Sequence, residues 1–173
     1  MCSSDRDLPG IVCGVGEDLP FPDDRFDLVF SNEVIEHVAD DRRTAHEMVR
    51  VTKPGGLIVI FAPNRLYPFE THGAYLGKRY VYGNIPLVGW MPDPVRDRLA
   101  PHVRAYTRGG IRRLFADEPV EIVFHRVIYP GFDNLSARHR RAGRILRSLL
   151  YAAERTPLHA FGLSHLIVVR KRA

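Results

Sequence analysis

The feature that most constrains the fold is the run Lys53-Pro54-Gly55-Gly56, which separates a helical pattern from an apolar stretch. Before it, apolar residues recur at helical spacing after a possible cap at Asp40 or Asp41. Proline cannot continue a helix, and the glycines allow positive φ angles. After it, the stretch from Leu57 to Ala62 is apolar at every position. Such a stretch is typical of a strand buried between two helical layers.

Shorter patterns upstream extend this into an α/β arrangement. The segments 11–13 and 26–30 each combine apolar residues with flanking turn signals, so each predicts a strand. Ser31 or Asn32 can cap a helix that begins near Glu33. Strand, helix and strand joined by short loops imply parallel pairing with a right-handed crossover.

The remainder of the chain shows the same alternation around an irregular segment. Thr107 can cap a helix that runs through Phe115, while 120–129 and 165–170 predict strands. Residues 63–101 contain six prolines and six aromatic residues, which indicates an ordered but irregular excursion of functional interest. We expect a single domain over residues 1–173, with inserts at about 63–101 and 130–157.

Composition excludes several classes of protein. A chain of 173 residues with 45% hydrophobic residues can bury a core without staples. Its two cysteines, Cys2 and Cys13, have no zinc-ligand spacing, which argues against a zinc ribbon and a disulfide scaffold. The longest apolar run is far shorter than the ~20 residues that span a bilayer. We therefore expect a cytoplasmic protein.

The net charge of +5 is concentrated in the C-terminal half, where residues 138–154 predict an amphipathic helix. One face of this helix carries isoleucine and leucine, and another carries Arg140, Arg141, Arg144 and Arg147. The helix could pack on the core or a partner with its basic face in solvent, or it could rest on an anionic membrane near 138–153. We expect no nucleic-acid binding, because the arginines lack an aromatic stacking platform.

Four short motifs, in fixed order within residues 17–56, resemble class I S-adenosylmethionine-dependent methyltransferases of the type 11 group. They are Glu17-Asp18-Leu19-Pro20-Phe21, Phe26-Asp27-Leu28-Val29, Glu36-His37-Val38 and Lys53-Pro54-Gly55-Gly56. The resemblance continues more loosely through residues 102–107 to the last strand. It implies an α/β fold with an incomplete Rossmann-like sheet, three layers deep, made of the family's strands three to seven and lacking the first βαβ unit.

The resemblance also implies a shortened N-terminus. The family's glycine-rich loop and the acidic residue that follows need a βαβ unit of about 30 residues, which does not fit before Ile11. We expect an N-terminally truncated member, either natural or with its start placed too late. Methyl transfer by this chain alone is expected to be impaired.

Residues at two places are implied to hold the cofactor, S-adenosylmethionine. They are Val15, Gly16 and Glu17 beside the adenine, and Ser31, Asn32 and His37 near the reacting methyl group. The family often has an acid where Val15 stands, so that contact is lost or passes to Glu17. The alternatives are a solvated acidic turn at 15–17 and simple helix capping at 31–32.

No catalytic residue is assigned, with His37 as the candidate. Glu33, Glu36 and His37 would share one helical face and could ligate a divalent ion, as a similar cluster does in related quinone O-methyltransferases. We expect no metal here and assign His37 to packing and hydrogen bonding beside the donor pocket.

Acceptor-binding groups usually follow the family's fifth strand, which implies a role for Asn64, Arg65, Tyr67, Glu70 and His72. With Trp90 they suggest a partly apolar pocket with some hydrogen-bonding groups, although each could be structural. The expected function is methyl transfer to a small-molecule or lipid-like acceptor. The alternative is a non-catalytic, methyltransferase-like remnant or interaction module.

Overall fold

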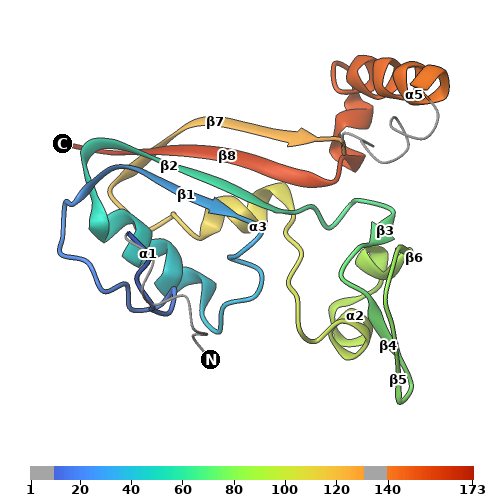
Figure 1. Cartoon of the computed structure of the whole chain (residues 1–173), viewed down its shortest axis with the longest axis horizontal. Coiled ribbons are helices and arrows are strands. Elements are labelled where there is room, and N and C mark those ends of the chain that lie inside the picture. The colour runs from blue at the N-terminus through green and yellow to red at the C-terminus, as the bar shows by residue number, and fades with distance from the viewer. Residues whose placement is uncertain (1–9, 131–139) are drawn as a thin grey trace.

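The computed structural model describes residues 10–130 and 140–173, and its centre is a four-stranded sheet (Figure 1). The strand order is β1-β2-β8-β7. β1 pairs with β2 in parallel, whereas β8 runs antiparallel to both β2 and β7. The strands are β1 (Phe26–Asn32), β2 (Thr52–Pro63), β7 (Val120–Ile128) and β8 (Ser164–Lys171). The strands predicted at 26–30, 57–62, 120–129 and 165–170 are confirmed, as is the parallel pairing.

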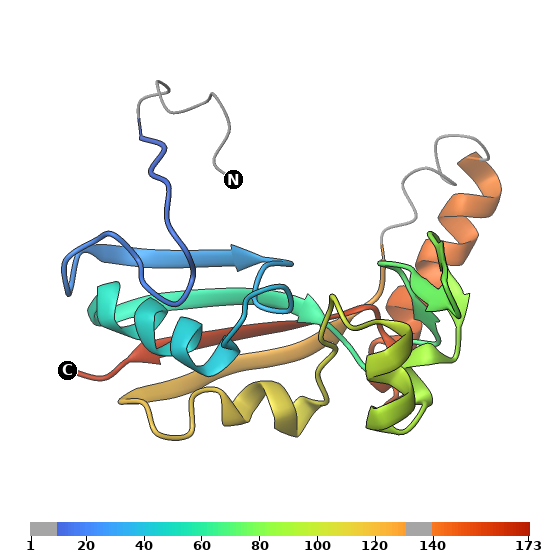
Figure 2. The same ribbon diagram turned by 90° about the horizontal axis from the view of Figure 1, so that it is seen from below.

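Two helices, α1 (Asp41–Val51) and α3 (Arg108–Arg113), cover one face of the sheet (Figures 1 and 2). Both begin at the predicted caps, because the Asp40 side chain accepts from the Arg43 amide and the Thr107 hydroxyl accepts from the Gly110 amide. The main core lies between this layer and the sheet. Its largest fully buried members are Ile35, Ile58, Ile60, Ile111 and Ile167.

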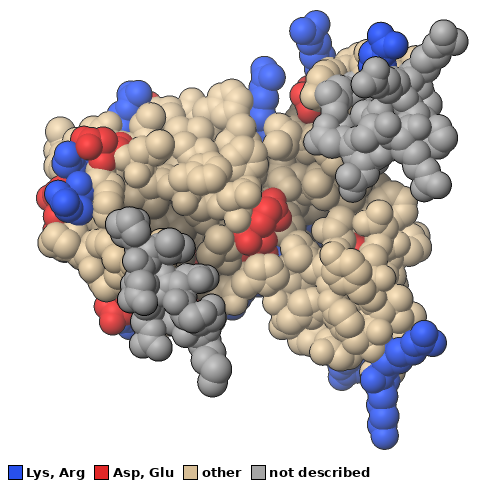
Figure 3. Space-filling view, in the orientation of Figure 1, with Lys and Arg blue, Asp and Glu red and all other residues tan. Residues whose placement is uncertain are grey.

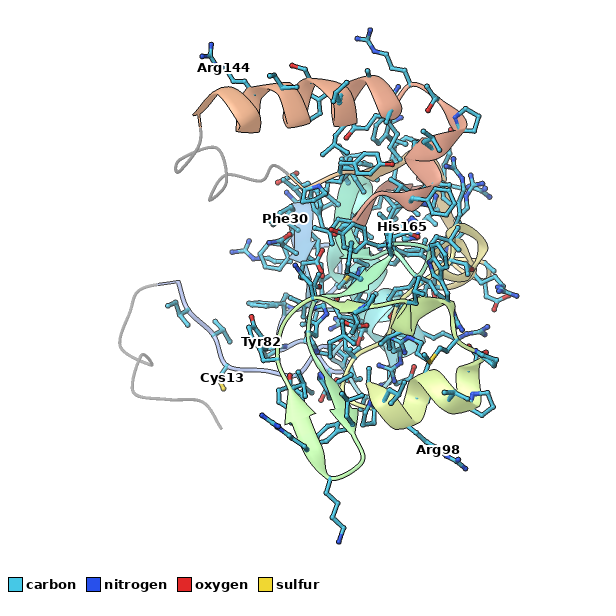
Figure 4. The ribbon with its side chains drawn as sticks, turned by 90° about the vertical axis from the view of Figure 1, so that its right-hand side faces the viewer. Cys13, Phe30, Tyr82, Arg98, Arg144 and His165 are labelled. Atoms are coloured by element: carbon cyan, nitrogen blue, oxygen red, sulfur yellow. The ribbon has the colours of Figure 1, made fainter. Side chains whose placement is uncertain are left out.

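The opposite face of the sheet lacks a helical layer in the described part of the chain (Figure 1). Ile58 and Ile60 of β2 are fully buried, but Val59 and Phe61, which alternate with them along the strand, are only half-buried. On the edge strand β1, Phe30 is 60% exposed (Figure 4). The prediction that β2 is buried between two helical layers is therefore wrong for the described residues, because only alternate side chains face the core.

Between β2 and α3 the chain forms a small separate lobe (Figure 2). Two short ladders, β3–β6 and β4–β5, pack with α2 and η2 around a second core of Ala74, Val88, Ala100 and Val103. The elements are β3 (Phe69–Glu70), β4 (Ala74–Leu76), β5 (Arg79–Val81), β6 (Ile85–Pro86), η2 (Val88–Trp90) and α2 (Asp93–Leu99). The irregular excursion expected at 63–101 takes this form.

The predicted basic helix is present as α5 (Arg140–Ala153), followed by η3 (Pro157–Phe161). α5 lies beyond the ends of β7 and β8, and Arg144 points away from the rest of the molecule (Figures 1 and 4). The start predicted at 138 lies outside the described residues. Within residues 10–130 and 140–173, no helix has the length and apolar character that crossing a membrane requires.

Two predicted elements are not formed. Residues 11–13 are irregular and exposed rather than a strand, because no described strand pairs with them. Cys13, in this segment, is disulfide-bonded, which the sequence analysis did not predict (Figure 4). The helix expected from Glu33 is also wrong: residues 33–39 form turns, and Glu33 has a φ angle of 52°. Because residues 11–13 do not pair with the sheet, the strand that would correspond to the family's third strand is missing from the described sheet.

Arg50 of α1 ties the segment before β1 to the helix. Its guanidinium donates to the carbonyls of Leu19 (3.0 Å) and Phe21 (2.9 Å) and to Glu47 Oε1 (2.7 Å). The Glu47 carboxylate also accepts from the Leu19 amide at 2.8 Å. The hydrogen bonds from Arg50 lower the pKa of Glu47 to about 2. Glu47 therefore stabilises the fold mainly in its charged form.

We expect Glu47→Gln to lose about 1–3 kcal/mol of unfolding free energy near neutral pH, because the charged hydrogen bonds weaken. The folded pKa of Glu47 lies below its ordinary 4.5, so this stabilisation is complete above about 4.5 and is lost as pH falls towards 2. Urea unfolding at several pH values measures it. The exposed Glu121→Gln serves as the control, and a difference independent of pH would contradict the assignment.

Candidate functional site

The loop that follows β1 is shaped by contacts from residues 104–106. The Arg104 amide donates to the Glu36 carbonyl (3.0 Å), and the Arg104 guanidinium donates to the carbonyls of Val38 and Ala39. The Tyr106 hydroxyl lies 3.1 Å from the Ile35 carbonyl and 2.9 Å from Asp41 Oδ2. These contacts satisfy carbonyls that a helix would have used internally, which is why turns replace the predicted helix.

Within this loop, Glu36 and His37 meet His72 from the lobe after β2. Glu36 Oε1 lies 3.8 Å from His37 Nε2 and 4.0 Å from His72 Nε2, and the two imidazole centroids are 5.2 Å apart. The Glu36 side chain is fully buried, whereas those of His37 and His72 are 43% and 24% exposed. We call these three residues the Glu36–His37–His72 cluster.

Burial raises the pKa of the Glu36 carboxyl to about 7, and the nearby Glu33 carboxylate contributes to the rise. Neither Glu36 oxygen has a hydrogen-bond partner. Glu33 itself is turned towards the sheet, where its Oε1 accepts from the Ser164 hydroxyl at 2.8 Å. The three residues expected to share one helical face therefore do not, since Glu33 is held by β8 and no helix forms.

Two further side chains orient His72. Glu70 Oε1 lies 3.1 Å from His72 Nδ1, and its other oxygen lies 3.8 Å from Arg96 Nη2. Arg96 is buried and donates to the Val103 carbonyl at 2.9 Å. The hydrogen bond to Glu70 raises the pKa of His72. Burial alone would raise the pKa of Glu70, yet hydrogen bonds from His72 hold it below the ordinary value.

A cavity of about 510 Å³ adjoins the cluster. Glu36 and His37 line one side of it, and α2 with the segment that follows lines the other, including Arg96, His102 and Arg104. Acidic atoms reach the surface close to the carboxyl end of β1 (Figure 3). The loop that follows the carboxyl end of β1 thus lines a hollow with ionisable groups, and loops at this edge are the usual place for a ligand in an open α/β sheet.

The residues predicted to hold the cofactor lie at the carboxyl end of β1 and in a turn that packs on α1. Ser31, at the carboxyl end of β1, is buried and its hydroxyl has no partner, while Asn32 beside it is exposed. Neither caps a helix. The turn at 15–18 is closed by a 3.2 Å bond from the Asp18 amide to the Val15 carbonyl. A Cβ at Gly16 would lie 2.9 Å from Thr44 of α1, so this turn packs directly on the helix.

Glu17 already has a role within the fold. Its Oε1 accepts from the Asp40 amide at 3.0 Å, and this hydrogen bond lowers the pKa of the Glu17 carboxyl. Its carbonyl accepts from Arg43 at 2.8 Å. Val15 is 59% exposed. The 15–17 turn is therefore held against the start of α1, where its backbone and the Val15 side chain face outwards.

Of the residues predicted to bind the acceptor, two are occupied by structural contacts. The Asn64 amide donates to the carbonyls of Ala160 and Gly162, both at 2.7 Å, and so joins the end of β2 to η3. Arg65 donates to carbonyls of the lobe and pairs with Asp93. Tyr67 is half-buried, and burial raises its pKa. Only His72 joins the cluster with His37.

Sequence reasoning placed Glu70 among the acceptor-binding candidates, but it did not place Arg96 and His102 at the site. Glu70 and His72 are two residues apart, which is a visible signal for a carboxylate–imidazole pair. Arg96 and His102 follow more than 20 residues later, and they reach the site only because α2 packs against the lobe. No local pattern reports such a contact.

A second histidine pair is formed by His125 of β7 and His165 of the neighbouring strand β8. His125 Nε2 is 3.1 Å from His165 Nδ1, and His165 Nε2 is 2.9 Å from the Tyr106 carbonyl. Burial lowers the pKa of His125 to about 4 and also lowers that of His165. Both imidazoles are therefore neutral near pH 7, and they fix Tyr106 against β8.

The residues present fit part of a cofactor site. The orphaned Ser31 hydroxyl and the exposed Asn32 amide offer polar groups at the strand end, and the 15–17 turn offers main-chain groups beside α1. Val15, Gly16, Glu17, Ser31, Asn32 and His37 stay the predicted donor-binding residues. The described residues contain no glycine-rich loop between a strand and a helix.

We expect Glu70→Gln to lower the pKa of His72, because the charged acceptor that favours the imidazolium is removed. The pH titration of histidine ring nitrogens by NMR measures this. His46 makes a matched 3.1 Å contact with Glu118, and its resonances should be the same in both proteins. An unchanged His72 titration would contradict the pairing.

Comparison with known sequences supports the motif analysis. Residues 2–60 match the family model of the methyltransferase domain. A protein of Mycolicibacterium vanbaalenii, named an uncharacterized methyltransferase, is 47% identical over 68 residues, covering 37% of this chain and 27% of that protein. A similarly named protein of Mycobacterium tuberculosis is 42% identical over 83 residues, covering 42% and 33%. The chain thus spans about a quarter to a third of these relatives.

Comparison with solved structures shows the fold. An S-adenosylmethionine-dependent methyltransferase from Mesorhizobium loti superposes with a TM-score of 0.53 at 17% identity, over 91% of this chain and 67% of that one. The [4+2]-cyclase SpnF gives 0.52 at 17% identity, over 94% and 55%. The Rossmann-like methyltransferase fold class is thus confirmed. Residues 2–60 therefore match the model of the methyltransferase domain family, the sheet shares the fold of these solved structures, and S-adenosylmethionine is the cofactor that this similarity leads us to expect.

Proposed function

We propose that this chain supplies the acceptor side, and part of the donor side, of an S-adenosylmethionine-dependent methyltransferase that acts on a small-molecule or lipid-like acceptor. The observation that carries the proposal is the meeting of the Glu36–His37–His72 cluster with a cavity of about 510 Å³ between the loop that follows β1 and the segment that includes α2. In open α/β sheets this edge is where ligands bind.

Methyl transfer depends on the alignment of donor and acceptor more than on covalent catalysis by the protein. The bound cofactor would supply an electrophilic methyl group, and the protein would orient the acceptor and exclude water. Ser31, Asn32 and His37 would position the donor at the end of β1. In the metal-free chain, His72, held by Glu70, would accept a proton from an acceptor hydroxyl or amine at its Nε2. Tyr67 would contribute half-buried surface to the acceptor side.

We further propose that the 173 residues alone bind the cofactor weakly. The turn at 15–17 and the end of β1 offer few contacts, and the described part has no glycine-rich loop. The alternative function is a non-catalytic interaction module that has the sheet but does not bind the donor. A cytoplasmic location stays a prediction from the sequence.

Calorimetric titration with S-adenosylhomocysteine tests the donor site. The 173-residue chain is compared with a chimaera in which the N-terminal part of the Mycolicibacterium vanbaalenii relative is joined ahead of residue 10. We expect the chimaera to bind at least tenfold more tightly, a gain of about 1.4 kcal/mol. Asn32→Ala should weaken binding by the chimaera, while the distant Glu121→Gln should not. Absence of binding in both proteins would favour the interaction module.

The α5 helix supports a peripheral membrane contact as part of this proposal. Ile145 and Leu149 are each 63% exposed on a helix that also carries arginines. Leucine and isoleucine can insert at a bilayer surface while arginines attract anionic lipid. A lipid-like acceptor would then be reached at the membrane.

Vesicle co-sedimentation tests this contact. Retention on vesicles rich in anionic lipid should fall with increasing salt. Replacement of Arg140, Arg141, Arg144 and Arg147 by serine should weaken vesicle binding by about 4 kcal/mol, or roughly 1000-fold, at ~1 kcal/mol per arginine. Ile145→Glu with Leu149→Glu should abolish retention. Leu76→Glu, at a site 55% exposed on the lobe, is the matched control. Equal retention of all variants would remove the membrane contact from the proposal.

A further inference from the structure

The Glu36–His37–His72 cluster has the arrangement of a metal site. Each residue offers one ligand atom, and the three atoms lie within 4.8 Å of one another. Glu36 Oε1 is 3.8 Å and 4.0 Å from the two imidazole Nε2 atoms, which is too far for hydrogen bonds. In a tetrahedral zinc site, ligand atoms ~2.0–2.1 Å from the ion lie about 3.3 Å apart. A small contraction would therefore bring these atoms to ligand spacing.

The buried carboxylate is the independent sign of a missing partner. Both oxygens of Glu36 lack a hydrogen-bond partner although the side chain is fully buried. An unpaired buried carboxylate is strongly unfavourable, so it needs either a proton or a cation. The neighbouring Glu33 carboxylate increases that need, because two like charges repel.

The tautomers of both histidines direct a lone pair towards Glu36. His37 Nδ1 lies 3.2 Å from the His102 carbonyl, which can only accept, so Nδ1 carries the proton and Nε2 has the lone pair. His72 Nδ1 lies 3.1 Å from Glu70, which orients its Nε2 in the same way. A carboxylate or carbonyl behind a ligating histidine is the usual support of a metal site.

We propose that Glu36, His37 and His72 bind a divalent transition-metal ion of the zinc class. Two imidazoles and one carboxylate suit zinc, iron or cobalt better than magnesium or calcium, which prefer oxygen ligands throughout. Two arginines line the same cavity, and each faces a carboxylate other than Glu36: Arg96 lies 3.8 Å from Glu70, and Arg104 lies 3.8 Å from Asp41. Because Glu36 and His37 also line the cavity, at least one coordination position faces it. A role in orienting an acceptor would rest on the proposed function, but metal binding does not.

The ligand set differs from the one that the sequence suggested. Glu33 is held by Ser164 of β8, and His72, from the lobe, stands in the place expected for it. Three ligands from two separate segments would also fix the lobe to the loop after β1. Metal binding should therefore raise the thermal stability of the protein.

Titration of the untagged, metal-free 173-residue protein with Zn²⁺ by calorimetry, and with Co²⁺ by visible absorption, tests the proposal without any cofactor. We expect one ion per chain and a rise in melting temperature. His37→Ala and His72→Ala should each weaken binding at least about 100-fold, and Glu70→Gln about tenfold. His46→Ala is the matched control, because His46 also lies 3.1 Å from a carboxylate, that of Glu118. The affinity of this variant for Zn²⁺ should equal that of the wild type.

The competing state is a proton shared between Glu33 and Glu36. Infrared spectra of the metal-free protein should show a protonated carboxyl band near neutral pH, which Zn²⁺ abolishes. Glu36→Gln should remove both the band and the binding, and circular dichroism verifies that each variant folds. The half-exposed His37→Gln serves where a buried variant does not fold. Binding that survives His37→Gln and His72→Ala, or a band that Zn²⁺ leaves in place, would overturn the proposal.

Discussion

The site depends on the way that residues 102–106 complete the backbone of the loop after β1. Arg104 and Tyr106 satisfy carbonyls between Ile35 and Ala39, and the Tyr106 carbonyl accepts in turn from the Arg65 amide and lies 2.9 Å from His165. The same short segment therefore joins β8, the end of β2 and the loop. Because these bonds satisfy successive backbone carbonyls of the loop, they hold the loop in one shape. That shape brings Glu36 inwards rather than into solvent.

Much of the fold could be predicted because its signals are local. Apolar runs marked the four strands of the sheet, and the side chains of Asp40 and Thr107 marked two helix starts. The errors arose where the partner is distant in sequence. Residues 33–39 carry a cap and helical spacing, yet their carbonyls bond to a segment about 65 residues away, as the contact between Arg104 and Ala39 shows. A sequence pattern over one or two helical turns does not show that a distant segment competes for the same backbone carbonyls.

The site was predictable in its members more than in its geometry. His37 and His72 were assigned to different ligands, donor and acceptor, but the structure brings their rings to 5.2 Å. Asn64 and Arg65 have the right residue types for binding, yet their polar atoms are satisfied by backbone of η3 and the lobe. Composition could not distinguish these cases, because a polar side chain after a strand serves either purpose. Only the hydrogen bonds in the structure show which of these polar side chains have structural partners and which are left to bind a ligand.

The fold alone does not determine the reaction. A [4+2]-cyclase and a methyltransferase superpose on this chain almost equally well, so the chemistry must be argued from side chains at the strand ends. There the most informative group is Glu36. Arg50 surrounds Glu47 with hydrogen bonds and lowers its pKa to about 2, as expected of a carboxylate that serves stability. Glu36 is more deeply buried than Glu47 and lacks such bonds, so it weakens the fold unless something binds it. A buried carboxylate without hydrogen-bond partners, next to a cavity, is therefore typical of a binding site rather than of a packed core.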